Sequence, residues 1–262
     1  GRLAQQPIVA PGSDIVADCV AAVRALDRSY LYVQGPPGAG KTFSGSRMIA
    51  ALLANGRRVG VMSNSHKAIN HLMSGALDEA LRQRIRVHAM KKSSRGSAES
   101  ELEYAGGDGV FAENESNSEA VWCSSANLLG GTVWFFADRP EDVEPVDYLF
   151  VDEAGQVALA NLVAAGANAR NIVLLGDQMQ LGQPIQGVHP GRSGDSALEY
   201  LLDGVATIAP DRGIFLATTW RMHPDVCRFI SDAVYDGRLQ PEANNVRRTL
   251  VLTADAHPLL RS

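Results

Sequence analysis

The stretch that decides the fold is Gly35-Pro36-Pro37-Gly38-Ala39-Gly40-Lys41-Thr42, which matches the pattern GxxxxGK[ST]. An apolar run over residues 30–34 precedes it, and a segment with helical character over residues 42–54 follows it. A strand, a glycine-rich loop and a helix, in that order, form the context in which this pattern holds the phosphates of a nucleotide. The stretch therefore predicts an α/β fold with a phosphate-binding loop.

The residue types in this loop suit phosphate chemistry. Glycines let backbone N–H groups close around phosphates, and the helix N-terminus adds its dipole. Lys41 is expected to reach the β and γ phosphates, while the Thr42 hydroxyl is expected to bind Mg²⁺. The predicted cofactors are ATP and Mg²⁺. The predicted nucleotide contacts are Gly35, Pro36, Pro37, Gly38, Ala39, Gly40, Lys41 and Thr42.

Further short runs rich in β-branched and aromatic residues alternate with helical segments along the chain. This alternation predicts βαβ units and a parallel β-sheet flanked by helices on both faces. The expected strands after residues 30–34 are 59–63, 120–124, 148–152, 172–175 and 214–217. The expected helices are 42–54, 67–82 and 159–168.

Residues 91–118 differ in composition from the rest of the chain. They are rich in Ser, Gly and Glu and show neither helical nor strand periodicity. We expect a flexible insertion here, and a solvated loop without function is the simpler alternative.

Composition sets further limits on function. Hydrophobic residues make up 45% of the 262 residues, which is typical of a globular protein, and the net charge of −5 argues against nonspecific coating of nucleic acid. A basic groove on an acidic body remains compatible with that charge.

Three scattered cysteines indicate neither disulfides nor zinc and fit a cytoplasmic location, and no apolar run predicts a membrane partner. The N-terminus lacks an initiator Met, which suggests a piece of a larger protein.

Two carboxylates follow the apolar run of residues 148–151. Asp152 and Glu153 should therefore lie at the carboxyl edge of the sheet, where ligands of such folds bind. Asp152 is expected to hold Mg²⁺, and Glu153 to act as the general base that deprotonates the attacking water. An Asp-Glu pair alone is more often a solvated turn, so this interpretation depends on the phosphate loop upstream.

Two later strand ends carry further candidates. Asp177 and Gln180 follow one strand, and the Gln180 amide could sense the γ-phosphate. Arg221 follows another and is the arginine-finger candidate. Trp220 has two open roles, stacking on adenine or packing in a core, and His223 is expected to be structural.

Five segments occur in the order and spacing of motifs I, Ia, II, III and IV of superfamily 1 helicases: GPPGAGKT, VGVMSNSHKAI, VDEAGQ, GDQMQLGQP and TWRMHPDVCRFISDAVYDGRL. The chain resembles the branch that contains the nonsense-mediated-decay RNA helicases and the Dna2-type nuclease-helicases, whose motifs read DEASQ, GDxxQLxP and YRMHP. The resemblance covers residues 30–239. Within that branch, SHKAI and DEAGQ look closest to bacterial proteins in which a RecB-like nuclease precedes the helicase.

The resemblance implies a RecA-like P-loop NTPase lobe over residues 30–239, after a lead-in and first helix over 1–29 and before the start of a second lobe over 240–262. It implies the catalytic roles given above for Lys41, Glu153, Gln180 and Arg221, and the metal roles of Thr42 and Asp152. The implied partners are single-stranded DNA or RNA, a second RecA-like lobe downstream and a fused nuclease upstream. The implied nucleic-acid contacts are Ser63, Asn64 and Ser65, for which a simple turn is the alternative.

Some positions depart from the family pattern. Asp18 stands where relatives place an adenine-reading Gln, Gln183 is an extra residue before Pro184, and Trp220 replaces the usual Tyr. Residues 91–118 occupy the place of an accessory β-barrel but are too few for an independent core. Residues 121–131 resemble a further nucleic-acid-contacting motif, in which Trp122 is expected to be core.

The chain stops before motifs V and VI, so we expect one lobe alone to bind nucleotide, hydrolyse it slowly and unwind nothing. The predicted function is the ATP-binding and ATP-hydrolysing core of a superfamily 1 DNA or RNA helicase. The alternative is a nucleotide-dependent switch that controls a fused nuclease or a partner without unwinding. A metabolic P-loop transferase is disfavoured, because GDxxQL and WRMHP have no role there.

Overall fold

The computed structural model describes residues 6–10, 12–180 and 190–248. Its centre is an entirely parallel sheet of eight strands, in the order β4-β3-β5-β2-β6-β7-β1-β8. The strands are β1 (Tyr30–Gln34), β2 (Val59–Met62), β3 (Val87–Lys92), β4 (Val110–Glu115), β5 (Leu128–Gly131), β6 (Val146–Val151), β7 (Ala169–Gly176) and β8 (Gly213–Phe215).

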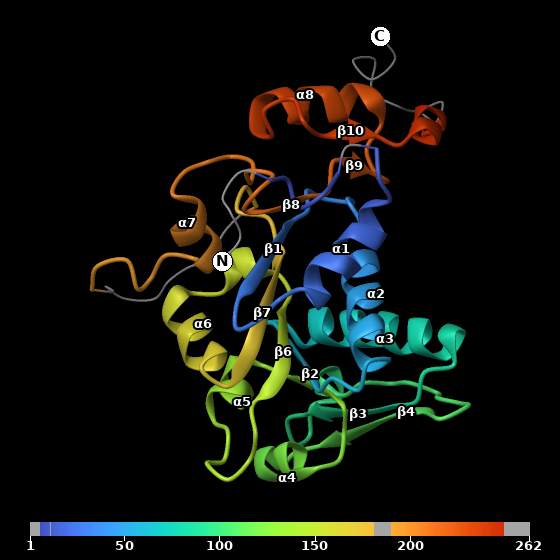
Figure 1. Cartoon of the computed structure of the whole chain (residues 1–262), viewed down its shortest axis with the longest axis vertical. Helices are drawn as coiled ribbons and strands as arrows, with labels where there is room; N and C mark the ends of the chain where they lie inside the picture. Colours follow the sequence, from blue (N-terminus) through green and yellow to red (C-terminus); the bar gives the residue numbers. More distant parts are fainter. Residues whose placement is uncertain (1–5, 11, 181–189, 249–262) are drawn as a thin grey trace, which may run out of the picture.

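Helices cover both faces of this sheet, and Figure 1 shows α1, α2 and α3 on one side and α5, α6 and α7 on the other. The 3₁₀ turns of the described residues are η1 (Ala98–Ser100), η2 (Ala154–Gln156) and η3 (Ala243–Arg247). The helices are α1 (Ile15–Arg24), α2 (Lys41–Leu53), α3 (His66–Gln83), α4 (Ser118–Cys123), α5 (Val133–Ala137), α6 (Leu159–Gly166), α7 (Ala197–Leu202) and α8 (Pro224–Val234).

The period of two along the strands divides the core into two layers. In β1, Leu31 and Val33 belong to the cluster under α1 to α3, whereas Tyr32 belongs to the opposite cluster. In β6, Phe150 faces the first layer and Leu149 the second. Strands buried on both faces explain why the sequence shows continuous apolar runs rather than alternation. The predicted α/β class with a parallel, doubly covered sheet is confirmed.

The strand expected at residues 120–124 is wrong, because this segment forms α4 (Ser118–Cys123). The Asn117 side chain accepts hydrogen bonds from the backbone N–H groups of Glu119 (2.9 Å) and Ala120 (3.2 Å) and so caps a helix. The true strand is β5, which begins five residues later at Leu128. Trp122 is completely buried, as expected of a core residue.

The expectation that residues 91–118 lack regular structure is also wrong. The segment contains the end of β3, the turn η1 and β4, which pairs in parallel with β3 from Val110 to Glu115. Asn114 secures the excursion by accepting from Leu102 N (2.8 Å) and donating to Leu102 O (3.1 Å). The buried Lys91 ammonium donates to Ser100 O (3.3 Å) and ties η1 to the sheet. These long-range hydrogen bonds leave no periodicity in the sequence.

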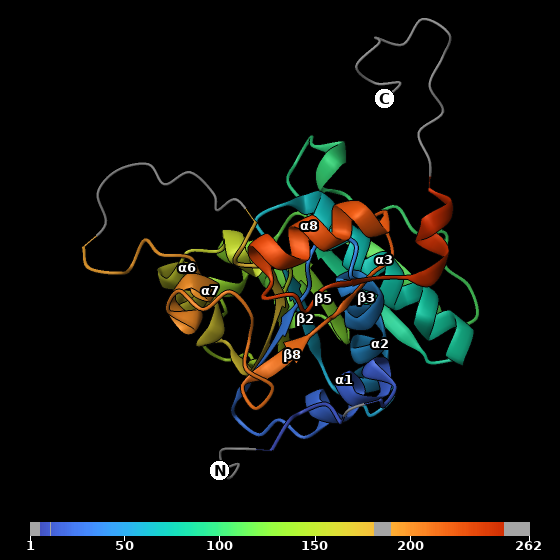
Figure 2. The same ribbon diagram turned by 90° about the horizontal axis from the view of Figure 1, so that it is seen from above.

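Above the carboxyl ends of β1 and β8, the chain forms a small two-stranded unit of β9 (Thr218–Thr219) and β10 (Gln240–Pro241), with α8 beside it (Figure 1). Viewed from above, α8 lies across the end of the main sheet (Figure 2). Asn245 Nδ2 donates to Thr219 O (2.9 Å). Residues 240–248 therefore pack on this unit, beyond the lobe boundary expected at 239.

Candidate nucleotide site

The loop between β1 and α2 has the backbone of a phosphate cradle. Gly38 and Gly40 have φ values of +75° and +87°, in the left-handed region that favours glycine. Gly40 is the N-cap of α2 and, because it has no side chain, it cannot accept hydrogen bonds from the first N–H groups of the helix. The first N–H groups of a 13-residue helix therefore point toward the loop without a capping side chain, which suits an anion.

The segment after β8 docks directly on this loop. Thr219 Oγ1 donates to Pro37 O (3.0 Å), and Trp220 N donates to Gly38 O (2.9 Å). A methyl group at Gly38 would lie 2.6 Å from Arg221 Cβ, so glycine is what allows this close approach. These contacts hold Arg221 beside the phosphate loop, although 183 residues separate it from Gly38 in the sequence.

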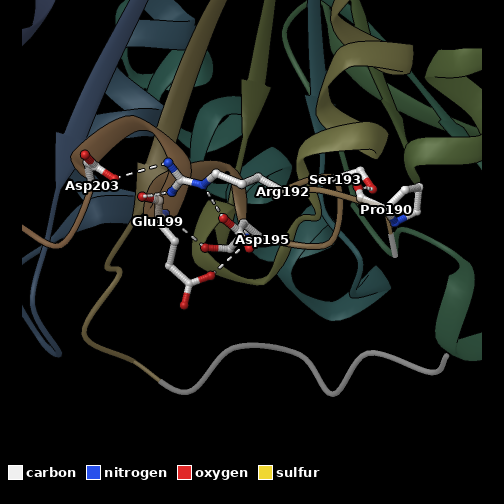
Figure 3. Close-up of polar contacts among 7 residues, drawn as sticks. Pro190, Arg192, Ser193, Asp195, Glu199 and Asp203 are labelled. Carbon is white, nitrogen blue, oxygen red and sulfur yellow. Dashed lines mark hydrogen bonds and ion pairs between the residues drawn. The ribbon is translucent and has the colours of Figure 1, made fainter. Parts of the chain in front are cut away.

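Arg221 and Arg192 differ in how their guanidinium groups are engaged. Arg192 donates from Nε to Asp195 Oδ2 (2.6 Å), from Nη1 to Asp203 Oδ1 (3.1 Å) and from Nη2 to Glu199 O (3.4 Å), as Figure 3 shows. Its charge therefore stabilises the turn before α7. The Arg221 guanidinium makes no hydrogen bond or ion pair within the described parts of the chain. Arg221 is thus the arginine that could contact a phosphate.

Two connected hollows meet at the loop. The larger is a cleft of about 1290 Å³ whose lining includes Pro37–Thr42, Trp220 and Arg221, and Trp220 is 58% exposed rather than packed in the core. The smaller hollow, of about 300 Å³, brings together predicted site residues that follow three different strands of the sheet. Its lining includes Lys41, Thr42, Asp152, Glu153, Gln180, Ser65 and Lys67.

Lys41 stands at the start of α2 with its ammonium turned back onto the loop, where it donates to Gly35 O. Burial lowers the pKa of this ammonium, and the carboxylates of Asp177 and Asp152 oppose that shift. The charge is therefore partly desolvated and faces acidic groups. Such an ammonium interacts more strongly with a phosphate than a hydrated surface lysine does.

Asp152 is only 6% exposed, directly after β6. Burial raises the pKa of its carboxyl to about 6, the Glu153 charge adds to the rise, and hydrogen bonding to the Glu153 N–H (2.9 Å) together with the Lys41 charge opposes it. A bound cation would favour the ionised form. The burial thus makes Asp152 responsive to a metal ion.

Glu153 has a φ of 54°, a left-handed conformation that residues other than glycine seldom adopt. Backbone strain of this kind concentrates at functional sites. The turn η2 begins at the next residue, and Glu153 is among the residues that line the small pocket.

Gln180 and Asp177 follow β7, and Gln180 Nε2 donates to Asp177 Oδ2 (3.3 Å). The same oxygen accepts from the Tyr235 hydroxyl (2.6 Å), which comes from the end of α8. Sequence reasoning missed Tyr235, because nothing in its local pattern marks a contact with a residue 58 positions away. Gln183 and Pro184 lie outside the described residues.

The residues present fit a magnesium ion bound together with a nucleotide. Thr42 supplies a hydroxyl and Asp152 a carboxylate in one pocket, and Mg²⁺ prefers few protein oxygens plus phosphates and water. A cage built by protein alone is not expected here. The described residues contain no group of three or more His, Cys, Asp or Glu that could hold a metal.

The three predicted nucleic-acid contacts lie in the turn between β2 and α3. Ser63 is fully buried, Asn64 Nδ2 donates to Gln156 O (2.8 Å), and Ser65 caps α3 by accepting from Ala68 N (3.3 Å). Their side chains thus shape the turn, and their contact with nucleic acid stays a prediction. His223 has the expected structural role, since its Nδ1 accepts from Asp225 N (3.3 Å) at the start of α8.

One further observation concerns membranes. Within the part of the chain that the structure describes, no helix has both the length and the apolar character needed to cross a bilayer.

Comparison with known proteins agrees with this geometry. The chain is 24% identical over 236 residues to the DNA replication ATP-dependent helicase/nuclease dna2 of Schizosaccharomyces pombe, covering 87% of this chain and 16% of that protein. It is 24% identical over 250 residues to the regulator of nonsense transcripts 1 homolog of Drosophila melanogaster, covering 82% and 20%. The chain thus spans about a fifth or less of the length of these two relatives.

Among solved structures, the fold is similar to Arterivirus nonstructural protein 10 (helicase) in complex with DNA, with a TM-score of 0.51 and 16% identity. That match covers 91% of this chain and 47% of the viral chain. The narrower resemblance to bacterial RecB-like nuclease fusions stays a prediction. The AAA domain family matches residues 17–193, more than half of the chain. The chain therefore belongs to the AAA domain family, and it is similar to Dna2 and to the regulators of nonsense transcripts.

Proposed function

We propose that this chain is the ATP-binding and ATP-hydrolysing core of a superfamily 1 DNA or RNA helicase. The observation that carries the proposal is the small pocket in which the ends of β1, β2, β6 and β7 meet. Lys41, Asp152 and Glu153 line it from the nucleotide side, and Ser65 and Lys67 line it from the turn expected to contact nucleic acid. A single hollow that joins both groups is suited to coupling hydrolysis with movement on a strand.

Each side chain has a role that its position supports. The loop N–H groups and Lys41 bind the phosphates, while Thr42 and Asp152 hold Mg²⁺, which would neutralise charge on the phosphate oxygens. Glu153 accepts the proton of the attacking water. Gln180, fixed through Asp177, senses the γ-phosphate, and Arg221 stabilises the charge that develops on it.

Trp220 lines the larger cleft with much of its ring exposed, which supports stacking on the adenine. The adenine-reading Gln of relatives is replaced by Asp18, which accepts from the Ser13 hydroxyl and lies in α1. We infer that stacking, more than hydrogen bonding, holds the base. Weak selection between ATP and GTP is the consequence.

The proposed partners are single-stranded DNA or RNA, a second RecA-like lobe and a fused nuclease in the whole protein. A cytoplasmic location belongs to the same proposal. The decisive experiment measures ATP hydrolysis by the protein of the full reading frame, with and without oligo(dT) and oligo(U). Stimulation by either supports the helicase, and equal rates with and without both oligonucleotides contradict it.

Two substitutions separate hydrolysis from switching. Glu153→Gln is expected to keep ATP affinity within about twofold and to lower the hydrolysis rate about 10²- to 10⁴-fold, because only the proton acceptor is lost. Lys41→Ala is expected to lose ATP binding itself. Glu144→Gln, whose carboxylate is on the surface in an ion pair with Arg170, is the control and should match the wild type.

The same pair of variants tests the alternative of a nucleotide-dependent switch. Unwinding should be lost in both Lys41→Ala and Glu153→Gln if hydrolysis drives movement. If Glu153→Gln retains the activity of the whole protein while Lys41→Ala loses it, nucleotide binding alone suffices, and the switch replaces the motor.

A further inference from the structure

Four residues line both hollows of the nucleotide site: Lys41, Thr42, Gln180 and His71. The first three have roles in the proposed function, and His71 has none. This histidine belongs to α3 and is exposed, and it makes no hydrogen bond or ion pair within the part of the chain that the structure describes. An imidazole without a protein partner, where two hollows of a nucleotide site join, is available to a ligand.

The packing of α3 against α2 brings His71 close to the start of α2, and Figure 1 shows both helices on the same side of the sheet. Gly75 marks the contact, because a methyl group there would lie 3.9 Å from Thr42 Cγ2 and 2.5 Å from Ser46 Oγ. His71 precedes Gly75 by four residues and so lies on the same face of α3. Side chains of a helix lean toward its N-terminus, and Ser65 at that end lines the small pocket. The imidazole therefore stands on the Thr42 side of this pocket.

His71 is also close to the carboxylate that follows β6. Burial raises the pKa of the Asp152 carboxyl, and the charges of Lys41 and His71 lower it. The imidazole is thus within electrostatic reach of Asp152. His71 therefore lies near both residues that are expected to hold Mg²⁺, Thr42 and Asp152.

The acceptors that α3 offers to the small pocket are few. Magnesium keeps several bound waters, and the protons of these waters need acceptors. The pocket residues from α3 and its N-cap are Ser65, Lys67, Ala68 and His71. The Ser65 hydroxyl is engaged as the cap, since it accepts from Ala68 N (3.3 Å), and Lys67 has donors only. His71 is therefore the side chain of α3 with an acceptor to offer.

We propose that His71 is a positioning residue for the Mg²⁺–nucleotide complex, and that its neutral imidazole accepts a hydrogen bond from a water bound to the metal. This inference rests on the proposed function and adds a residue that supports the metal from outside its direct ligands. The phosphates are held by the loop N–H groups and Lys41. His71 is therefore expected to affect the binding of nucleotide with Mg²⁺ and not the binding of nucleotide alone.

Fluorescence anisotropy of mant-AMPPNP, an ATP analogue that is not hydrolysed, tests the proposal in titrations with MgCl₂ and in EDTA. His71→Ala is expected to raise the Mg²⁺ concentration needed for half-maximal binding by about 10- to 100-fold, the range for loss of a hydrogen bond that supports a metal ligand. Affinity in EDTA should stay within about twofold of the wild type, because the phosphate contacts are unchanged. That result would also show that the variant is folded.

Two further variants sharpen the measurement. His71→Gln keeps a side-chain acceptor and should restore most of the Mg²⁺ dependence of the wild type. Ser74→Ala is the matched control, because Ser74 lies on the same face of α3 and lines the larger cleft but not the small pocket. It should behave like the wild type.

The outcomes separate this inference from the proposed function. If the wild type binds the analogue neither with Mg²⁺ nor in EDTA, the proposed function fails and the inference fails with it. If the wild type binds and His71→Ala shows the same Mg²⁺ dependence, the inference is overturned while the proposed function stands. An equal loss of affinity with Mg²⁺ and in EDTA also overturns it, because the imidazole then contacts the nucleotide or shapes the pocket. A His71→Gln variant as weak as His71→Ala does the same, since an acceptor is then not what this position supplies.

Discussion

At the scale of single residues, burial makes the ionised form of Asp152 unfavourable, and a bound cation would stabilise that form. A carboxyl that is 6% exposed and has a pKa of about 6 is harder to ionise in the folded chain than in the unfolded one. The folded state therefore binds the proton more tightly. The protonated Asp152 carboxyl therefore stabilises the folded state fully below pH 3.8, its pKa in the unfolded chain. This contribution to the free energy of unfolding is lost as the pH rises through about 6.

We predict that Asp152→Asn stabilises the nucleotide-free chain at neutral pH. The shift of about two pKa units corresponds to about 3 kcal/mol, so the free energy of unfolding should exceed that of the wild type by up to that amount at pH 7 to 8. Near pH 4 the two proteins should be equally stable. Urea unfolding from pH 4 to pH 8 measures the difference, and a difference that does not vary with pH would contradict the prediction.

Single residues were also where sequence reasoning succeeded most. The phosphate loop and the carboxylates Asp152 and Glu153 could be assigned because each follows an apolar strand, and parallel strands deliver their ends to one edge. The structure brings them into one pocket with Gln180. The strained φ of Glu153 could not be foreseen, because it results from the tight turn into η2.

At the scale of elements, α8 reaches back to support the end of β7. His223 caps the helix and Pro224 starts it. The helix ends at Val234, and the hydroxyl of the next residue, Tyr235, donates to Asp177. Burial raises the pKa of that hydroxyl, and the hydrogen bond to Asp177 raises it further. Tyr235 therefore remains a donor throughout the physiological pH range.

Tyr235→Phe is expected to lower the free energy of unfolding by about 1.5 to 3 kcal/mol, the range for a hydrogen bond to a charged group. Hydrolysis should fall too, because Gln180 is held through the same Asp177 oxygen. Urea unfolding and steady-state ATPase rates measure both effects. Tyr200→Phe, at a 45% exposed position, is the control. A Tyr235→Phe variant as stable and active as the wild type would show that Asp177 needs no partner from α8.

Elements were predicted well where the local pattern was strong. The strands predicted at residues 30–34 and 148–152 and the helix predicted at 42–54 agree with β1, β6 and α2 within a few residues. The errors at 120–124 and 91–118 arose where local and long-range forces disagree. At residues 120–124 a cap by Asn117 favours a helix where a strand was predicted. Within residues 91–118, pairing with β3 produces the strand β4 from a polar segment.

At the scale of the whole molecule, charge is distributed unevenly between the two edges of the sheet. Lys92 ends β3 and Arg95 follows it at the carboxyl edge, whereas Arg57 and Arg170 stand at the amino ends of β2 and β7 in contact with acidic partners. Lys92 and Arg95 make no ion pair within 4 Å among the described residues, although Glu115 lies beside them at the end of β4. The acidic net charge therefore does not exclude nucleic-acid binding.

This distribution predicts the salt dependence of single-strand binding. Each phosphate contact contributes about −0.7 to the slope of log affinity against log salt concentration. The double variant Lys92→Ala/Arg95→Ala should therefore reduce the magnitude of the slope by about 1.4 in anisotropy titrations over a roughly sixfold range of salt, from about 50 to about 300 mM. Arg57→Ala/Arg170→Ala removes equal charge from the other edge and should leave the slope unchanged. Equal slopes for both double variants would mean that the strand avoids this edge.

The sequence by itself determined the class of fold, the nucleotide loop and the acidic pair, because these depend on short-range patterns: an apolar strand, a glycine-rich turn and a helix. Only the tertiary structure decided that Tyr235 supports Asp177 and that Arg221, rather than Arg192, stands free beside the phosphate loop. These relations join residues that are distant in the chain. They come from sheet order and register, to which no local spacing in the sequence corresponds.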